Sequence, residues 1–84
     1  MLDTTTPTLE DAKSAVRTFW TFRQEMSDSD TVRMTIEEIR CYISEAKAEG
    51  RKVTAEEWHE MAELVDEACD DDGLPRLYRY EVAS

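Results

Sequence analysis

The sequence predicts an all-α fold, a small three-helix bundle with an extended C-terminal tail, and three observations support this. Apolar residues recur at helical spacing in three stretches of the chain. Capping residues precede these stretches, and Gly50 and Gly73 follow the second and the third. The chain has 84 residues with only two glycines and two prolines, and a chain of this length forms one small domain. We therefore expect a single helical domain over residues 1–84.

The first helix is expected over about residues 8–26. Thr8 is its predicted N-cap, with Asp11 three residues later, and Pro7 blocks extension towards the N-terminus. The apolar stripe consists of Leu9, Ala12, Val16, Phe19, Trp20 and Met26. Phe22 lies beside this stripe, where it either widens the core face or serves as an interface aromatic.

The second helix is expected over about residues 35–49. Thr35 and Glu38 have the spacing of a capping box, and Met34 and Ile39 that of a hydrophobic staple. Its apolar stripe consists of Ile36, Ile39, Ile43 and Ala46. The preceding residues 27–33, "SDSDTVR", have the composition of a loop.

The third helix is expected over about residues 54–71. Thr54 and Glu57 form its predicted capping box, and Val53 and Trp58 its staple. The segment "GRKV" leaves only a short connection to the second helix, which predicts an antiparallel helical hairpin.

The tail, residues 74–84, alternates in the manner of a lone strand, with Tyr78, Tyr80 and Val82 on one side. Such a strand lies across the bundle, pairs with its copy in a homodimer, or adds to the sheet of a partner protein.

Composition excludes several classes of protein. A net charge of −10 and an isoelectric point near 4.4 argue against direct binding to nucleic acid or to an anionic membrane. The chain has neither an apolar run long enough for a membrane span nor the pattern of a signal peptide. Two cysteines, Cys41 and Cys69, are too few for a disulfide scaffold. We expect free thiols and a cytoplasmic protein.

The residues for catalysis are also missing. One histidine and two glycines cannot supply a Ser-His-Asp set or a phosphate-binding loop, so we expect neither an enzyme nor a cofactor. "HEMAE", residues 59–63, lacks the ligands of a zinc site, and we expect His59 to pair with Glu63. If Gly73 is aligned with the turn glycine of a calcium loop, Ala68 and Arg79 fall at ligand positions, which excludes an EF-hand. A looser cation site on Asp70, Asp71 and Asp72 is left as an alternative.

The strongest functional indication is a segment of one charge sign. Residues 54–73 contain nine carboxylates and no lysine or arginine. At about 100° per residue, five of the acids lie opposite the apolar face of the third helix. We call these five residues the acidic ridge: Glu56, Glu60, Glu63, Glu67 and Asp70. Each neighbouring pair of like charges costs about 0.2–0.5 kcal/mol, so the helix carries this pattern at a local cost.

The acidic ridge resembles the charge pattern of small acidic inhibitors that phages direct against host machinery, including anti-CRISPR and DNA-mimic proteins. The resemblance implies a non-enzymatic protein that occludes a basic, nucleic-acid-binding surface of a partner protein. We expect the contact on the ridge and on Asp71 beside it. A plain solvated face that favours solubility is the simpler alternative.

A second hypothesis is a small helical dimerisation or adaptor module. In that case the contact is apolar, made by Phe22, Tyr78 and Tyr80.

Overall fold

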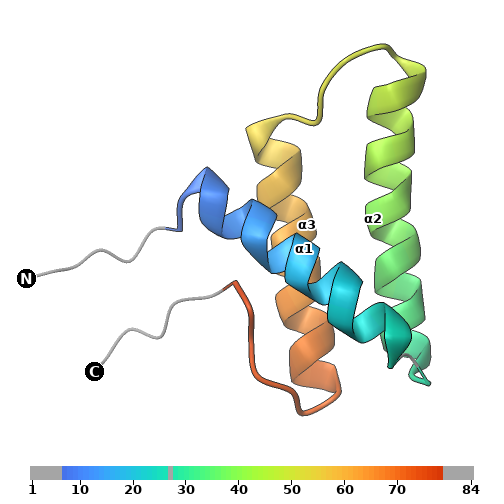
Figure 1. The fold of residues 1–84 in the computed structure, drawn as a ribbon, viewed down its shortest axis with the longest axis vertical. Helices are drawn as coiled ribbons and strands as arrows, with labels where there is room; N and C mark the ends of the chain where they lie inside the picture. The colour runs from blue at the N-terminus through green and yellow to red at the C-terminus, as the bar shows by residue number, and fades with distance from the viewer. Residues whose placement is uncertain (1–6, 27, 79–84) are drawn as a thin grey trace, which may run out of the picture.

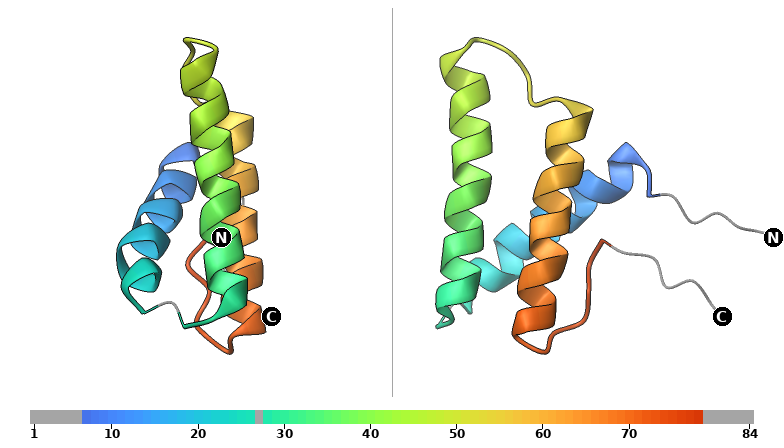
Figure 2. Two further views of the ribbon diagram at one scale, coloured as in Figure 1. Left: turned by 90° about the vertical axis from the view of Figure 1, so that its right-hand side faces the viewer. Right: turned by 180° about the vertical axis from the view of Figure 1, so that it is seen from behind.

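The computed structural model describes residues 7–26 and 28–78. These residues form α1 (Leu9–Glu25), α2 (Asp30–Ala48) and α3 (Ala55–Asp71). α2 and α3 lie side by side and antiparallel, and α1 crosses one face of this hairpin (Figures 1 and 2). α3 packs against both other helices, and its packing against α1 is the most extensive. The fold is the all-α three-helix bundle that the sequence predicts.

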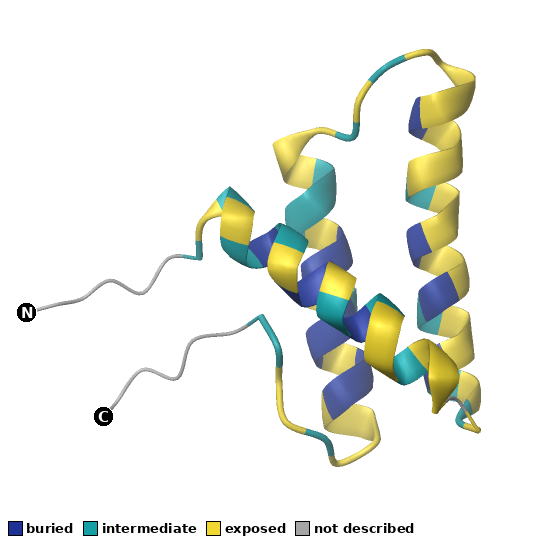
Figure 3. Ribbon diagram, in the orientation of Figure 1, coloured by how far each residue is buried: buried dark blue, intermediate teal, exposed yellow. Residues whose placement is uncertain are grey.

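The core lies where the three helices face one another, and the buried positions form a stripe along each helix (Figure 3). Met61, Val65 and Cys69 of α3 are fully buried, as are Phe19 of α1 and Ile39 of α2. The remaining buried apolar residues around them are Ala12, Ala15, Val16, Val32, Ile36, Ala62 and Ala68. Because many of these side chains are small, the helix backbones can approach closely at this crossing.

The capping boxes of α1 and α3 are confirmed. The Thr8 amide donates to Asp11 Oδ2 at 2.8 Å, and the Asp11 amide donates back to Thr8 Oγ1 at 3.2 Å. Thr54 and Glu57 exchange the same pair of bonds at 2.9 and 3.1 Å. Each box satisfies backbone N–H groups that have no partner within the helix.

Both glycines end their helices as expected. Gly50 has a φ of +71° and Gly73 a φ of +69°, in the left-handed region that favours glycine. The amide of Arg51 then donates to the carbonyl of Ala46 at 2.9 Å, and the amide of Leu74 donates to that of Cys69 at 2.7 Å. These bonds are those of a Schellman motif, so both helices stop at a defined residue.

The predicted start of α2 is wrong by five residues, because the helix begins at Asp30 and not at Thr35. The N-cap is Ser29, whose Oγ accepts from the amide of Val32 at 3.2 Å. The Thr35–Glu38 capping box and the Met34–Ile39 staple are therefore wrong as well. The polar segment before Met34 has loop composition, but buried Val32 stands four residues before Ile36 and extends the apolar stripe.

Two further expectations need correction. Met26 is 66% exposed, because it lies in the C-cap after α1 has left the core. In the tail, residues 74–78 form no strand. The rest of the tail, residues 79–84 with Tyr80 and Val82, lies outside the described residues, so the predicted strand is not tested there.

The helix boundary gives a first prediction. Ser29→Ala removes the N-cap of α2 and also the hydrogen bond that Ser29 Oγ makes with Asp72 Oδ1 at 3.2 Å. The free energy of unfolding should fall by about 1 kcal/mol. Urea unfolding followed by circular dichroism measures it. The control Thr35→Ala should change stability by less than about 0.5 kcal/mol, since Thr35 lies inside the helix. A larger loss in Thr35→Ala than in Ser29→Ala would place the start of the helix at Thr35 after all.

Candidate functional site

The acidic ridge faces away from α1. Two residues of α3 mark the side that faces α1. Lys13 Nζ lies 5.9 Å from the ring centroid of Trp58, and Arg23 Nη2 donates to Cys69 Sγ at 3.9 Å. The ridge lies on the opposite side of the helix at about 100° per residue, and all five ridge residues and Asp71 are exposed. We call the side of the α2–α3 hairpin that is turned away from α1 the outer face.

The ridge residues differ in their partners within the chain. Glu60 Oε1 accepts a hydrogen bond of 2.7 Å from the Tyr42 hydroxyl of α2. Asp70 forms an ion pair with Arg76 in the segment after α3, so its charge is balanced internally. For Glu56, Glu63 and Glu67, residues 7–26 and 28–78 offer no hydrogen-bond or ion-pair partner to the side chain. The sequence alone did not predict this division.

The bond between Tyr42 and Glu60 fixes the two helices at the outer face and carries an electrostatic effect. The Glu60 carboxylate accepts a hydrogen bond from the protonated phenol of Tyr42, and this bond raises the pKa of Tyr42 to about 12. Partial burial and the charges of Glu60 and Glu38 act in the same direction. Negative charge on α2 and α3 therefore converges around this tyrosine.

α2 adds carboxylates to the outer face that the sequence analysis missed. The guanidinium of Arg40 lies 5.6 Å from the ring centroid of Trp20 in α1, so this side of α2 faces α1. Arg33 and Lys47 are each seven residues from Arg40 and share that side. Glu38 and Glu45 lie about 140–160° further round, on the outer face. Glu38 had been assigned to a capping box; with α2 starting at Asp30 it becomes an exposed residue inside the helix.

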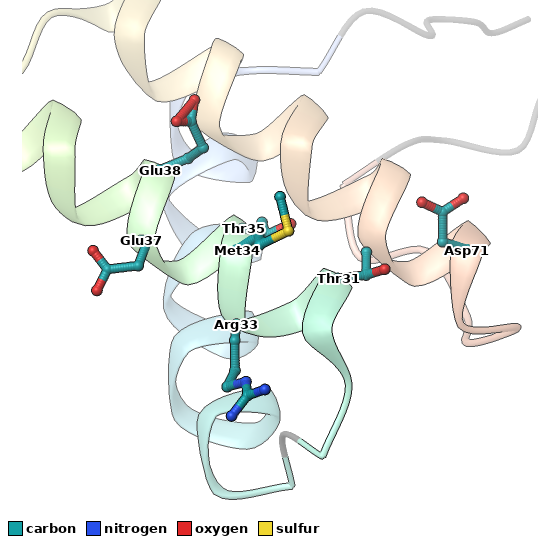
Figure 4. Close-up of a pocket in the computed structure, with 7 residues that line it drawn as sticks. All are labelled: Thr31, Arg33, Met34, Thr35, Glu37, Glu38 and Asp71. Atoms are coloured by element: carbon teal, nitrogen blue, oxygen red, sulfur yellow. The ribbon is translucent and has the colours of Figure 1, made fainter.

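A shallow groove opens between α2 and the C-terminal end of α3. Its lining residues are Thr31, Arg33, Met34, Thr35, Glu37, Glu38 and Asp71. Figure 4 shows Thr31, Thr35 and Glu38 directed from α2 towards α3, with Met34 between Thr31 and Glu38. Met34 is 69% exposed, the highest value among the exposed large apolar side chains. The groove thus places an uncovered thioether among carboxylates.

The segment after α3 is held by a buried carboxylate that the sequence analysis also missed. Asp66 is 6% exposed, and its Oδ1 accepts from the amides of Leu77 and Tyr78 at 3.1 and 3.0 Å. The Tyr78 hydroxyl is hydrogen-bonded to Nδ1 of His59. The predicted pairing of His59 with Glu63 is therefore wrong, because the imidazole of His59 is hydrogen-bonded through Nδ1 to the phenol of Tyr78 instead. Chain reversal at Gly73 brings these residues together, which residue spacing alone does not reveal.

The apolar contact residues of the second hypothesis are not brought together among the described residues. Phe22 is 57% exposed on α1. Tyr78 is half-buried against the core, and burial raises the pKa of its phenol. Tyr80 lies outside the described residues.

Basic side chains collect at the other end of the hairpin. Lys13, Lys47, Arg51 and Lys52 line a second hollow, beside Trp58 and Ile43. Arg51 is held by Glu57, with Nη1 at 2.8 Å from Oε1, and this bond lowers the pKa of Glu57 to about 2. Cations thus gather around the α2–α3 connection, while the carboxylates of the outer face run along α3 from Glu56 to Asp70.

The described part of the chain contains no group of three or more His, Cys, Asp or Glu side chains placed to hold a metal ion. In the Asp70–Asp72 cluster, Asp70 pairs with Arg76, and Asp72 Oδ1 accepts from Ser29. No helix of residues 7–26 and 28–78 is long and apolar enough to cross a membrane. Cys41 is exposed and Cys69 buried, both as free thiols.

No protein-family model matches this sequence, and neither the curated proteins nor the solved structures include one with significant similarity to it. The geometry of the outer face therefore carries the functional argument.

The Tyr42–Glu60 bond gives a second prediction. In Glu60→Gln the carboxylate that holds the phenolic proton is lost, so Tyr42 should ionise nearer pH 10 than its present value of about 12. Ultraviolet absorbance of tyrosinate, titrated from neutral pH upwards, measures the shift. Glu56→Gln is the control, because Glu56 does not contact Tyr42 and should leave the titration unchanged. Equal titration curves for the two variants would show that Glu60 and Tyr42 do not interact in solution.

Proposed function

We propose that this protein is a non-enzymatic acidic binding protein whose outer face covers a basic, nucleic-acid-binding surface of a partner protein. The proposal includes a cytoplasmic location. It also includes an inhibitory effect, because a partner whose nucleic-acid site is covered cannot bind nucleic acid. The observation that carries it is the charge of the outer face: carboxylates from two helices, with the cations of α2 on the opposite side.

The energetics of the fold support a functional reason for this charge. Glu56, Glu60, Glu63 and Glu67 repel one another across single turns. Within residues 7–26 and 28–78, Glu56, Glu63 and Glu67 lack the cations that would compensate this repulsion. Asp70, Asp71 and Asp72 add negative charge at the C-terminus of α3, where the helix dipole disfavours it. The same helix has a complete capping box and a Schellman motif, so its ends are optimised while its exposed side is not.

Geometry favours a partner that normally binds nucleic acid. From Glu56 to Asp70 the ridge spans about 21 Å at 1.5 Å per residue, with a carboxylate every 5–6 Å or so. This interval is close to the roughly 6–7 Å between phosphates along an extended strand. Glu38 and Glu45 form a second row on α2, about 8–10 Å from the first at ordinary helix packing distances. A lysine- and arginine-lined groove that accepts phosphates would accept these rows.

One observation favours the alternative, a dimerisation or adaptor module that binds through apolar surface. Phe22 and Met26 are one turn apart on α1 and are 57% and 66% exposed. Two adjacent large apolar side chains left in water are typical of a contact surface. In this alternative the carboxylates of the outer face act only to keep the protein soluble.

Charge reversal gives the third prediction. The triple variant Glu56→Lys, Glu63→Lys and Glu67→Lys should weaken partner binding by roughly 100-fold, or about 2.7 kcal/mol. Among the described residues the three side chains have no hydrogen bond or ion pair to lose, so helicity by circular dichroism should persist. Immobilised protein would first capture partners from a nuclease-treated extract of its native cell. Salt at about 1 M, where the Debye length is about 3 Å, should release them. The isolated partner is then tested for competition between this protein and DNA or RNA.

The control carries the same total charge change on other surfaces: Glu10→Lys, Glu25→Lys and Asp28→Lys. This variant should retain most of the affinity, because its substitutions lie in α1 and in the α1–α2 connection. Equal loss in both triple variants would reduce the effect to net charge alone. Full binding by the outer-face variant, with loss on Phe22→Ala, would establish the apolar alternative.

A further inference from the structure

The groove around Met34 differs chemically from the rest of the outer face. Most of the surface that lines it is apolar, and Thr31, Thr35 and Met34 carry methyl and thioether groups there. Its volume is about 630 Å³, and it is open to solvent along its length. A ridge of carboxylates alone would offer no such apolar floor.

Met34 has no cover from the described part of the chain. The Met34 side chain is 69% exposed, and α1 does not cover it because α1 packs on the other side of the hairpin. Methionine is unbranched and polarizable, and it adapts to irregular apolar surfaces on a partner. A single exposed methionine is ordinary, but Met34 lines a groove in which a side chain of a partner can cover it.

The rim of the groove is negative. In Figure 4, Glu38 of α2 and Asp71 of α3 lie on either side of Met34. Glu37 also lines the groove, but its side chain points away from α3 in Figure 4. Arg33 also lines the groove, but its Nη2 lies 2.5 Å from Asp30 Oδ1, and in Figure 4 its side chain points away from α3. A complementary occupant therefore has an apolar centre with positive charge on both sides.

This chemistry selects among occupants. A second copy of this chain that met the first face to face would bring its own carboxylates to the groove and be repelled. A nucleic acid is repelled for the same reason. A small polyamine supplies charge but little apolar surface for the thioether. A lysine- or arginine-rich protein segment with one large apolar side chain satisfies both requirements.

We propose that the α2–α3 groove binds such a segment of the partner protein, its apolar side chain covering Met34 and its cations meeting Glu38 and Asp71. This inference rests on the proposed function and adds to it an anchoring contact that is not electrostatic. The partner is then recognised by a charged surface together with one apolar residue at a fixed place within it.

Two synthetic lysine-rich peptides test the groove. They carry equal charge and differ at one central position, which is leucine in one and serine in the other. Binding to the full chain is followed by fluorescence anisotropy at low salt. The leucine peptide should bind about tenfold more tightly, as expected for burying part of a large apolar side chain. Met34→Gln, which keeps the side-chain length and the helix propensity, should lower the affinity for the leucine peptide to that for the serine peptide.

The matched control is Met26→Gln. Met26 is exposed to a similar degree, 66%, but lies at the end of α1, so this variant should bind both peptides as the unchanged protein does. Equal affinity of the two peptides, or an unchanged leucine preference in Met34→Gln, would overturn the groove. If both peptides bind equally and the outer-face charge reversal abolishes both, the proposed function stands without the groove. If neither peptide binds, the groove proposal fails, and the proposed function is decided by the capture of a partner and the charge-reversal variant.

Discussion

The structure depends on the burial of one side of α3 between the other two helices. Met61, Val65 and Cys69 are each fully buried, and they recur every four residues along this side. Burial of such side chains contributes about 1.5–3 kcal/mol each and is the main force that holds a domain of this size together. Once this side of α3 faces the core, helical periodicity determines the direction of Glu56, Glu63 and Glu67. They must project into solvent on the opposite side.

The same constraint explains why α2 matters for function. The hairpin connection holds α2 against α3, and the Tyr42–Glu60 hydrogen bond joins them at the outer face. Because Arg40 faces Trp20 of α1, the residues on the other side of α2 share the solvent-exposed face with the ridge. The acidic surface is therefore a product of packing as well as of sequence. α3 alone supplies the acidic ridge. Together with α2 it forms a two-helix surface that contains a groove.

Much of the fold could be predicted from the sequence, because the decisive information was local. The Thr8 and Thr54 capping boxes and the two left-handed glycines each depend on residues within about one turn, and all four are present. The start of α2 was missed because Ser29 and Asp30 suit a loop as well as a helix N-terminus. Only the burial of Val32 against the other helices decides between them.

The candidate site was predictable only in part, since its remaining features depend on tertiary contacts. The outward direction of the ridge follows from the helical period. The balancing of Asp70 by Arg76, the burial of Asp66 and the pairing of His59 with Tyr78 all require the chain to reverse at Gly73. No periodicity within α3 contains that information. The groove around Met34 likewise requires two helices at a particular register, and the misplaced start of α2 had assigned Met34 to a hydrophobic staple.

The cations of α2, Arg33, Arg40 and Lys47, lie on the side opposite the acidic outer face, which gives the molecule a permanent electric dipole across the hairpin. A particle with such a dipole rotates in the field of a cationic surface before it touches it. The acidic outer face would lead and the opposite face would trail, so fewer collisions would have the wrong orientation. Segregated charge thus acts on the speed of association as well as on its strength. A uniformly acidic protein of equal net charge would lack that advantage.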